Sequence, residues 1–459
     1  MSIYLYNTLT GKKEEFKPIK NKTVGIYNCG PTVYDSVHIG NIRTFTMYDI
    51  VRRVFEYEDY HVTQVMNITD VDDKTIKRSR EENKSLEEFT RFYENIFMKD
   101  IQKMNILPPH RLLRATEHIK EMIEMISILL EKGIAYPTRD GIYFSIGMIK
   151  DYGKLANIKL NDKVRERIAN DEYEKENPRD FALWKFSVED DGDVVWNTSF
   201  GNGRPGWHIE CSAMALWSLG ETIDIHMGGI DLIFPHHTNE IAQSEASSGK
   251  TFVNYWLHGA LMNVQEEKMS KSKGNFLKLK DLEDIPISSL AFRYWLLTSH
   301  YRSPVNFTIE AVKGAQNAYI RLIEVFIDFN SHHSNNHIHG IQRDYKKEFR
   351  EKITDDFNMP ESIALMWNMI KDHSLSPKEK SDLLLDFDRV FGLGLSEVLK
   401  IKKEIEIPKE IEALAEAREQ AREVREWDKA DALRKEIENR GWSIKDTESG
   451  YEVKKLSTF

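Results

Sequence analysis

The sequence predicts an α/β protein in which a parallel-sheet domain is followed by a helical region and a small α+β unit. Residues 24–28 form a short, apolar, β-branched run that stops at a glycine and a proline, where a buried strand cannot continue. Between Ile42 and Val54 apolar residues recur with helical spacing, and residues 60–68 form a second strand-like run. A strand, a helix and a second strand within this length predict a parallel βαβ unit.

The segments that follow continue this pattern. Residues 73–133 carry apolar side chains at the spacing of amphipathic helices, interrupted by the proline pair at 108–109. Residues 141–199 are irregular and rich in charge, and they predict an inserted, partly exposed region. Strand-like runs return at 222–227 and 252–262, and each leads into a polar loop.

The last third of the chain is expected to be mainly helical. Helical spacing extends through residues 301–400, and it returns after Pro408 with an interruption near Trp427 until Gly441 stops it. Residues 442–453 then alternate in polarity around a Ser-Gly pair, which predicts a hairpin.

Composition limits the kind of protein. A length of 459 residues permits about three domains, and a hydrophobic content of 41% is sufficient for their cores. No apolar run approaches a membrane span and the N-terminus has no signal-peptide pattern, so we expect no membrane segment. Two cysteines are too few for a disulfide framework and indicate a reducing cytoplasm. A formal net charge of −10 excludes a protein that coats nucleic acid through bulk positive charge. The four-histidine stretch at residues 331–340 is expected to be a flexible linker.

Polar residues cluster where the first two strands end. Cys29, His38 and Thr69 should lie at one end of the sheet, where open α/β folds bind ligands. Backbone N–H groups at a helix start attract phosphate, and the side chains of His38 and Asn41 can donate to phosphate oxygens as charge develops. The alternative is a polar helix start in which Gly40 allows close packing.

A lysine-rich loop lies about 230 residues further along the chain. It reads KMSKSKGN from Lys268 to Asn275 and includes Lys271. Short hydroxyl and amide side chains, backbone freedom and several lysines suit a loop that closes over a triphosphate. A solvated charged turn is the alternative.

Four residues form a candidate metal site. Cys29 lies in the turn before His38, and Cys211 ends the stretch 206–211. His236 and Glu240 have the i, i+4 spacing that makes them neighbours on a helix face. Two thiolates, one imidazole and one carboxylate suit zinc. Taken singly, each cysteine is more often a small buried hydrophobic residue than a ligand.

These motifs carry a specific resemblance. The HIGN and KMSKS elements resemble the signature pair of class I aminoacyl-tRNA synthetases. Together with NCGPTVYD, NITDVDDK, GRPGWHIECSAM and FPHHTNEIAQSEA, they make the chain similar to the cysteinyl-tRNA synthetase family through most of Tyr27–Asn275, and more loosely beyond. The resemblance implies a Rossmann-like nucleotide-binding catalytic domain, a helical tRNA-binding bundle and an anticodon-binding domain. The implied boundaries are 1–300 for the catalytic domain, with an insertion at roughly 113–200 and the KMSKS loop at 268–272, then 301–400 and 401–459.

The same resemblance implies the reaction. L-Cysteine would be activated by ATP to cysteinyl-adenylate and passed to the terminal ribose 2′-OH of tRNA(Cys) by a monomeric enzyme. One zinc ion per subunit would bind the substrate thiol, and magnesium would accompany ATP. The implied site residues are Cys29, Cys211, His236 and Glu240 for zinc; His38, Asn41, Lys268 and Lys271 for catalysis; His38, Asn41, Gly229, Asp231 and Lys271 for ATP; and Gly30, Thr69 and Trp207 for the amino acid.

Two departures and two alternatives accompany this interpretation. Asn41 replaces the last histidine of the HIGH pattern, and residues 264–267 lack the glycine often found before KMSKS.

A cysteine ligase acting on a small aminosugar would share the adenylating half and the zinc, but it has little use for an anticodon module. A non-catalytic RNA-binding relative is disfavoured because both nucleotide motifs and all four zinc candidates are intact.

Overall fold

A five-stranded parallel sheet forms the centre of the molecule. The computed structural model describes residues 1–157, 180–264, 267–268, 276–331, 343–404, 408–447 and 450–455. In the sheet the strand order is β11, β10, β3, β4, β5, and every neighbouring pair is parallel. The strands are β3 (Thr23–Asn28), β4 (His61–Ile68), β5 (Arg111–Arg114), β10 (Ile223–Gly229) and β11 (Val253–Gly259). The predicted α/β fold is therefore confirmed.

Alternate side chains of the central strand β3 face two different hydrophobic cores. Ile26 is buried in a core shared with the long helix behind the sheet, whereas Tyr27 is buried in a second core shared with helices on the opposite face. Burial on both faces is typical of parallel sheets covered by crossover helices. These helices are α1 (Ile39–Tyr57), α2 (Asp73–Glu81), α3 (Leu86–Lys103), α4 (Ile119–Glu131), α6 (Trp207–Leu219) and α7 (Thr238–Ser248).

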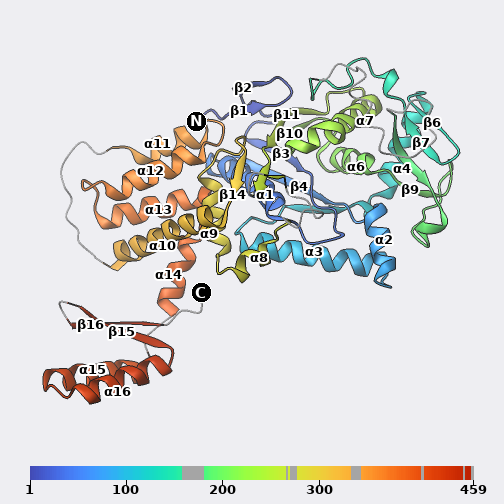
Figure 1. Ribbon diagram of the computed structural model, residues 1–459. Coiled ribbons are helices and arrows are strands. Elements are labelled where there is room, and N and C mark those ends of the chain that lie inside the picture. Colours follow the sequence, from blue (N-terminus) through green and yellow to red (C-terminus); the bar gives the residue numbers. More distant parts are fainter. Residues whose placement is uncertain are drawn as a thin grey trace.

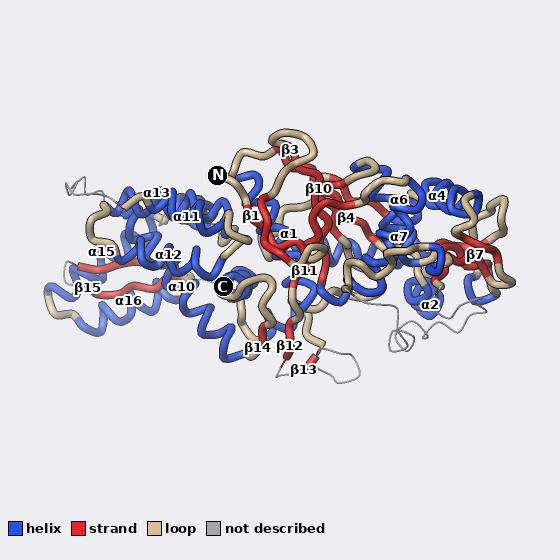
Figure 2. The backbone as a smooth tube through the Cα atoms, turned by 90° about the horizontal axis from the view of Figure 1, so that it is seen from above, coloured by secondary structure: helices blue, strands red, loops and turns tan. Residues whose placement is uncertain are grey.

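Four strands between residues 135 and 205 form a small antiparallel sheet of their own. Its strands are β6 (Ala135–Pro137), β7 (Gly141–Phe144), β8 (Phe181–Phe186) and β9 (Gly203–Pro205). Both views show this sheet on the opposite side of the central sheet from the helical region (Figures 1 and 2). A short hairpin, β1 (Tyr4–Asn7) with β2 (Lys12–Glu15), precedes β3.

The predicted helical region is confirmed, and it shares a core with the central sheet domain. Val51 of α1, Phe292 of α9 and Phe387 of α13 belong to one continuous cluster of buried side chains. The elements that lead from the sheet domain to the helical region are α8 (Leu279–Asp284), α9 (Ser289–Leu297) and β14 (Val305–Phe307). The helices that follow are α10 (Ile309–Ser331), α11 (Tyr345–Ile353), α12 (Met359–Lys371), α13 (Pro377–Phe391) and α14 (Leu395–Glu404). Residues 332–340 of the expected linker lie outside the described part of the chain.

The C-terminal unit has the helix pair and hairpin that the sequence predicts. It consists of α15 (Lys409–Glu423), α16 (Trp427–Asn439), β15 (Trp442–Thr447) and β16 (Gly450–Lys455), with a small core of its own. Figure 1 shows this unit set apart from the rest of the molecule, beyond α14.

Two details differ from the expectation. The fifth strand, β5, lies within the stretch assigned only to helices, because a four-residue edge strand with an arginine at each end gives almost no alternating signal. The single run expected at 252–262 is divided: β11 ends at Gly259, and β12 (Met262–Val264) pairs with β13 (Glu267–Lys268) and β14 in a separate sheet.

Candidate functional site

Two thiols, an imidazole and a carboxylate meet in the buried interior behind the ends of β3 and β10. Cys29 follows β3, Cys211 lies on α6, His236 lies in the helical turn Ile233–His237 that precedes α7, and Glu240 lies in the first turn of α7. Their ligand atoms all lie within 4.8 Å of one another, and all four residues are buried. The structure thus brings together the whole metal-ligand set that the sequence predicts.

The spacing of these atoms fits a tetrahedral metal. Zinc with a Zn–S distance of about 2.3 Å sets two ligand sulfurs about 3.8 Å apart. Here Cys29 Sγ lies 4.0 Å from Cys211 Sγ and 3.8 Å from Glu240 Oε1, and His236 Nε2 lies 3.0 Å from Glu240 Oε1. Small adjustments of these side chains would complete a tetrahedral coordination shell.

The protonation of the metal-free cluster also favours a cation. The hydrogen bond from Cys29 lowers the pKa of Cys211 to about 6, whereas burial raises the pKa of Cys29 well above its usual value. Burial alone would raise the pKa of Glu240, but His226 and His236 together lower it to about 2. Burial opposes the charge on His236, yet Glu240 and Cys211 raise its pKa to about 10. The protons on Cys29 and His236 are those that a divalent cation would displace.

Further histidines surround the cluster, and sequence reasoning did not single them out. His226 on β10 holds the second carboxylate oxygen of Glu240 at 2.9 Å, and His208 Nδ1 lies 2.9 Å from His236 Nδ1. Contacts of this kind orient metal ligands. The available signal was a pair of histidines placed inside the apolar runs of β10 and β11, where a polar side chain needs a partner.

Another histidine, His237, is an alternative to His236 as a metal ligand. His237 Nε2 lies 3.3 Å from Cys29 Sγ, and its Nδ1 lies 2.8 Å from Nε2 of His258. Cys29, His226, His237 and Glu240 form a second group with metal-ligand spacing. The two groups share Cys29 and Glu240, so the geometry is compatible with either His236 or His237 as the histidine ligand.

The three residues assigned to the amino acid lie next to this cluster. A chain of hydrogen bonds runs from the amide of Gly30 to Asn67 Oδ1 (2.8 Å), from Asn67 Nδ2 to Thr69 Oγ1 (3.3 Å), and from Thr69 to Glu210 (2.9 Å). A Cβ at position 30 would lie 1.7 Å from the carbonyl oxygen of Asn67, so only glycine fits there. Trp207 stacks on His236 with ring centroids 4.3 Å apart and is 43% exposed, so it lies between the cluster and solvent.

The residues assigned to phosphate lie at the start of α1, where they cap the helix. His38 Nδ1 accepts from the amide of Asn41 at 3.2 Å, and Asn41 Oδ1 accepts from the amide of His38 at 3.3 Å. Because Nδ1 accepts, the imidazole proton lies on Nε2. The amide nitrogen of Asn41 likewise remains the donating end of its side chain. The cap therefore orients both side chains as donors, which phosphate oxygens require.

The Gly229–Asp231 turn lies against the same helix. Gly229 ends β10, and a Cβ on it would meet the carboxylate of Asp231 at 2.4 Å and approach Thr44 of α1. Asp231 is exposed. This places a carboxylate beside the helix that begins with His38, at the sheet end where a ribose could reach it.

The lysine-rich loop is described only at its ends. Lys268 ends β13, whose backbone pairs with β12, whereas Lys271 and its neighbours up to Asn275 lie outside the described residues. Beyond the loop, the ring of Phe276 packs edge-on against that of His38, with centroids 4.8 Å apart. The described chain after the loop therefore lies beside the start of α1.

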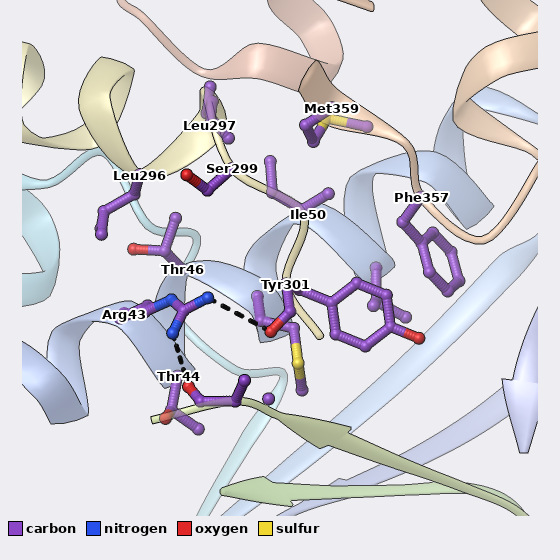
Figure 3. Close-up of a pocket in the computed structure, with 14 residues that line it drawn as sticks. Arg43, Thr44, Thr46, Ile50, Leu296, Leu297, Ser299, Tyr301, Phe357 and Met359 are labelled. Atoms are coloured by element: carbon purple, nitrogen blue, oxygen red, sulfur yellow. Dashed lines mark hydrogen bonds between the residues drawn. The ribbon is translucent and has the colours of Figure 1, made fainter. Parts of the chain in front are cut away.

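A separate cavity of about 30 Å³ lies behind α1 (Figure 3). None of the four cluster residues lines it. Its walls come from α1, the end of β11, α9 and the segment before α12. It is a junction between structural units, not the candidate catalytic site.

Comparison with known proteins identifies the family. Residues 15–317 match the family model described as the class I (C) tRNA synthetase catalytic domain, and residues 405–453 match that of the cysteinyl-tRNA ligase anticodon-binding domain. The chain is 43% identical to a cysteine–tRNA ligase from Brachyspira hyodysenteriae, over 99% of both proteins. It is 42% identical to one from Protochlamydia amoebophila, over 98% of this chain and 97% of that protein.

The chain belongs to the cysteinyl-tRNA ligase family. Solved structures agree with the fold of such a class I ligase. Mycobacterium tuberculosis methionyl-tRNA synthetase superposes with a TM-score of 0.60 at 13% identity, over 82% of this chain and 93% of that one. A leucyl-tRNA synthetase from Agrobacterium radiobacter superposes with a TM-score of 0.58 at 10% identity, over 83% and 85%.

Membership of the cysteinyl-tRNA ligase family argues against the aminosugar ligase considered from the sequence. The anticodon-binding model coincides with the C-terminal helix pair and hairpin, a unit that an aminosugar ligase would not need. Among the described residues of this ligase, no helix is both long and apolar enough to cross a membrane.

Proposed function

We propose that this protein activates L-cysteine with ATP and transfers it to tRNA(Cys). The observation that carries the proposal is the buried Cys29, Cys211, His236 and Glu240 cluster beside the helix that begins with His38. A thiol-selective centre and a phosphate-binding helix start are the two recognition elements that adenylation of cysteine requires. The family relatives support the same reaction.

The cluster is proposed to hold one zinc ion per chain. Its donors are of the types that zinc prefers, and their separations suit a tetrahedron. When bound, zinc supplies a Lewis acid that prefers a thiolate to an alcohol. His226 and His208 fix the carboxylate and imidazole ligands, and Trp207 covers His236 from the solvent side.

The adenylation step is assigned to residues at the start of α1 and in the lysine-rich loop. The cysteine carboxylate attacks the α-phosphorus of ATP, which arrives with Mg²⁺, and pyrophosphate leaves. His38 and Asn41 donate to phosphate oxygens as negative charge develops, and Lys268 and Lys271 neutralise the same charge from the loop. Gly229 allows the ribose to approach the backbone, and Asp231 accepts from its hydroxyl groups.

The amino acid is proposed to bind between β4 and α6. Gly30, Thr69 and Trp207 surround the space beside the metal ligands, and the hydrogen bonds through Asn67 and Glu210 fix the orientation of the Thr69 hydroxyl.

The helical region at 301–400 and the C-terminal unit at 401–459 are proposed to bind tRNA, the latter at the anticodon. We propose a monomeric protein that works in the cytoplasm, where both cysteines stay reduced.

Cysteine-dependent exchange of pyrophosphate into ATP, followed by charging of purified tRNA(Cys), tests this function. Exchange with cysteine alone among the amino acids, together with charging, is the expected result. Exchange without charging would indicate a different acceptor, and an absence of exchange with the zinc-loaded protein would contradict the proposal.

A further inference from the structure

Arg43 occupies an unusual position one turn into α1. Its side chain is buried, with 7% of the residue exposed. Among the described residues it has no carboxylate within ion-pair distance, and all its hydrogen bonds go to backbone carbonyl groups. Burial lowers its pKa to about 10, so the guanidinium still carries its charge at neutral pH. A buried cation balanced only by carbonyl groups is costly unless those groups are held in place around it.

The carbonyl groups come from two separate loops. Arg43 Nη1 donates to Ala260 O at 2.6 Å and to Leu261 O at 2.7 Å. Arg43 Nη2 donates to Tyr301 O at 3.4 Å (Figure 3). It also donates to the carbonyl groups of His300 and Ser303. The first loop leads directly into β12 and the second into β14, and these two strands pair with each other. The planar guanidinium therefore holds both loops at a fixed position relative to α1.

The second loop is attached in turn to the helical region. Three consecutive residues of this loop bind Asp356, which lies between α11 and α12. His300 Nε2 lies 2.9 Å from Asp356 O. Tyr301 donates to Asp356 Oδ1 at 2.7 Å, and Arg302 Nε donates to Asp356 Oδ2 at 2.8 Å. Asp356 is itself 3% exposed and has a φ of +57°. A non-glycine residue in this conformation is held there by its contacts.

The cavity of Figure 3 borders this junction. It is lined by Arg43 and its helix, by Tyr301, and by Phe357 and Met359 of the helical region. Arg43 and the second loop therefore lie at the boundary between α1 and the helical region.

We propose that Arg43 is a positioning residue, which keeps His38 and Asn41 in register with the strand that leads into the lysine-rich loop and connects both to Asp356 in the helical region. This inference rests on the proposed function, because it concerns the alignment of the two groups that act on ATP. Arg43 acts through the backbone of the two loops.

The decisive variant is Arg43→Lys, which keeps the charge but loses the fork that spans both loops. Arg53→Lys is the matched control, because Arg53 lies on the same helix and binds Asp49, Asn105 O and Arg389 O but neither loop. Misplacement of reacting groups by about 1 Å costs on the order of a hundredfold in rate. We expect Arg43→Lys to lower kcat for cysteine-dependent pyrophosphate exchange by about 10- to 100-fold, with KM for cysteine nearly unchanged. Arg53→Lys should keep kcat within about twofold.

A double-mutant cycle tests the connection to the helical region. Asp356→Asn should lower kcat less than Arg43→Lys, and the two effects should not add in the double variant, because both act through the 300–303 loop. The effects of Arg43→Lys and Arg53→Lys should add. Additive effects of Arg43→Lys and Asp356→Asn would overturn the proposed connection, and an unchanged kcat with only a lower Tm in Arg43→Lys would overturn the positioning role.

Hydrogen–deuterium exchange provides a readout that does not depend on activity. Arg43→Lys should speed amide exchange in residues 38–43 and 262–264, whereas Arg53→Lys should leave both segments protected. If wild-type protein shows no cysteine-dependent exchange of pyrophosphate, the proposed function fails, and amide exchange alone decides the role of Arg43. Unchanged protection in Arg43→Lys would then overturn it.

Discussion

The amide of Ile39 donates to the carbonyl of Leu277 at 2.9 Å, so that the chain leaving the lysine-rich loop is bound to the first residue of α1. Lys278 strengthens this attachment, because its ammonium group lies 2.9 Å from a carboxylate oxygen of Asp35. The loop therefore ends beside the helix start that carries His38 and Asn41. Leu277 and Lys278 thus fix the first described residues after the loop at the proposed phosphate site.

Replacement of Lys271 by alanine should slow adenylate formation by about 10²- to 10³-fold while KM for cysteine changes little, because the charge it neutralises develops in the transition state. Single-turnover measurement of adenylate formation checks this. Lys280→Ala, at an exposed position in α8, is the control and should behave as wild type. An unchanged rate in Lys271→Ala would show that the loop is not catalytic.

Metal analysis of the purified protein should find one zinc per chain. Replacement of both cysteines, Cys29→Ser with Cys211→Ser, should abolish it, because two thiolates supply most of the affinity for a soft site. His236→Asn should also lose zinc, whereas His237→Asn should retain it. The reverse outcome for the two histidines would transfer the ligand role to His237 and His226.

Cysteine should be preferred over serine by far more than about a hundredfold in kcat/KM, which is the range that fit to a pocket alone provides. A thiol deprotonates and binds zinc far better than an alcohol does. The ratio from pyrophosphate exchange measures this preference, and incubation with seryl-tRNA tests for hydrolysis. A ratio below that range, or rapid deacylation, would assign the selectivity to something other than the metal.

A buried ion pair joins α1 to α9, and its loss should destabilise the protein. Arg293 of α9 is fully buried, binds Asp49, and donates to Phe391 O at 2.7 Å and to Met104 O at 3.1 Å. Arg293→Met removes one of the two guanidinium partners of Asp49 and leaves Arg53 as the other, so it should lower the free energy of unfolding by about 3 kcal/mol, the lower end of the range for breaking a buried ion pair. Denaturant titration of the two proteins at pH 7 measures the difference.

The same pair gives a pH dependence. Burial alone would raise the pKa of Asp49, but Arg293, Arg53 and the amide of Leu107 lower it below its usual value. The ionised carboxylate therefore stabilises the folded state above the unfolded-state pKa of about 3.9, and this contribution is lost as the pH falls through the lower folded-state pKa. The stability difference between wild type and Asp49→Asn should accordingly be constant near neutral pH and shrink below about pH 4. A difference that grows on acidification would contradict this assignment.

The sequence alone determined the class of the fold and most of the candidate site. Periodicity located β3, α1 and β4, because a short apolar run followed by helical spacing leaves few alternatives. The parallel arrangement that these elements imply places residues after β3 and β4 at one edge of the sheet, which is why Cys29 and Thr69 could be placed beside each other from spacing alone. The C-terminal helix pair and hairpin could also be predicted from the sequence, because Gly441 ends the helical pattern and the Ser-Gly pair marks the turn of the hairpin.

The tertiary structure decided what no local pattern encodes. The histidines around Glu240 come from β10, from α6 and from the turn before α7. Only the folding of these elements onto one another makes His237 an alternative to His236 as a metal ligand. Strand β5 is recognised through its pairing with β4, because its four residues carry no periodic signal. The carbonyl groups that Arg43 binds lie more than 200 residues away in the chain. Backbone carbonyls are present at every position of a sequence, so only the folded structure shows which of them a buried arginine binds.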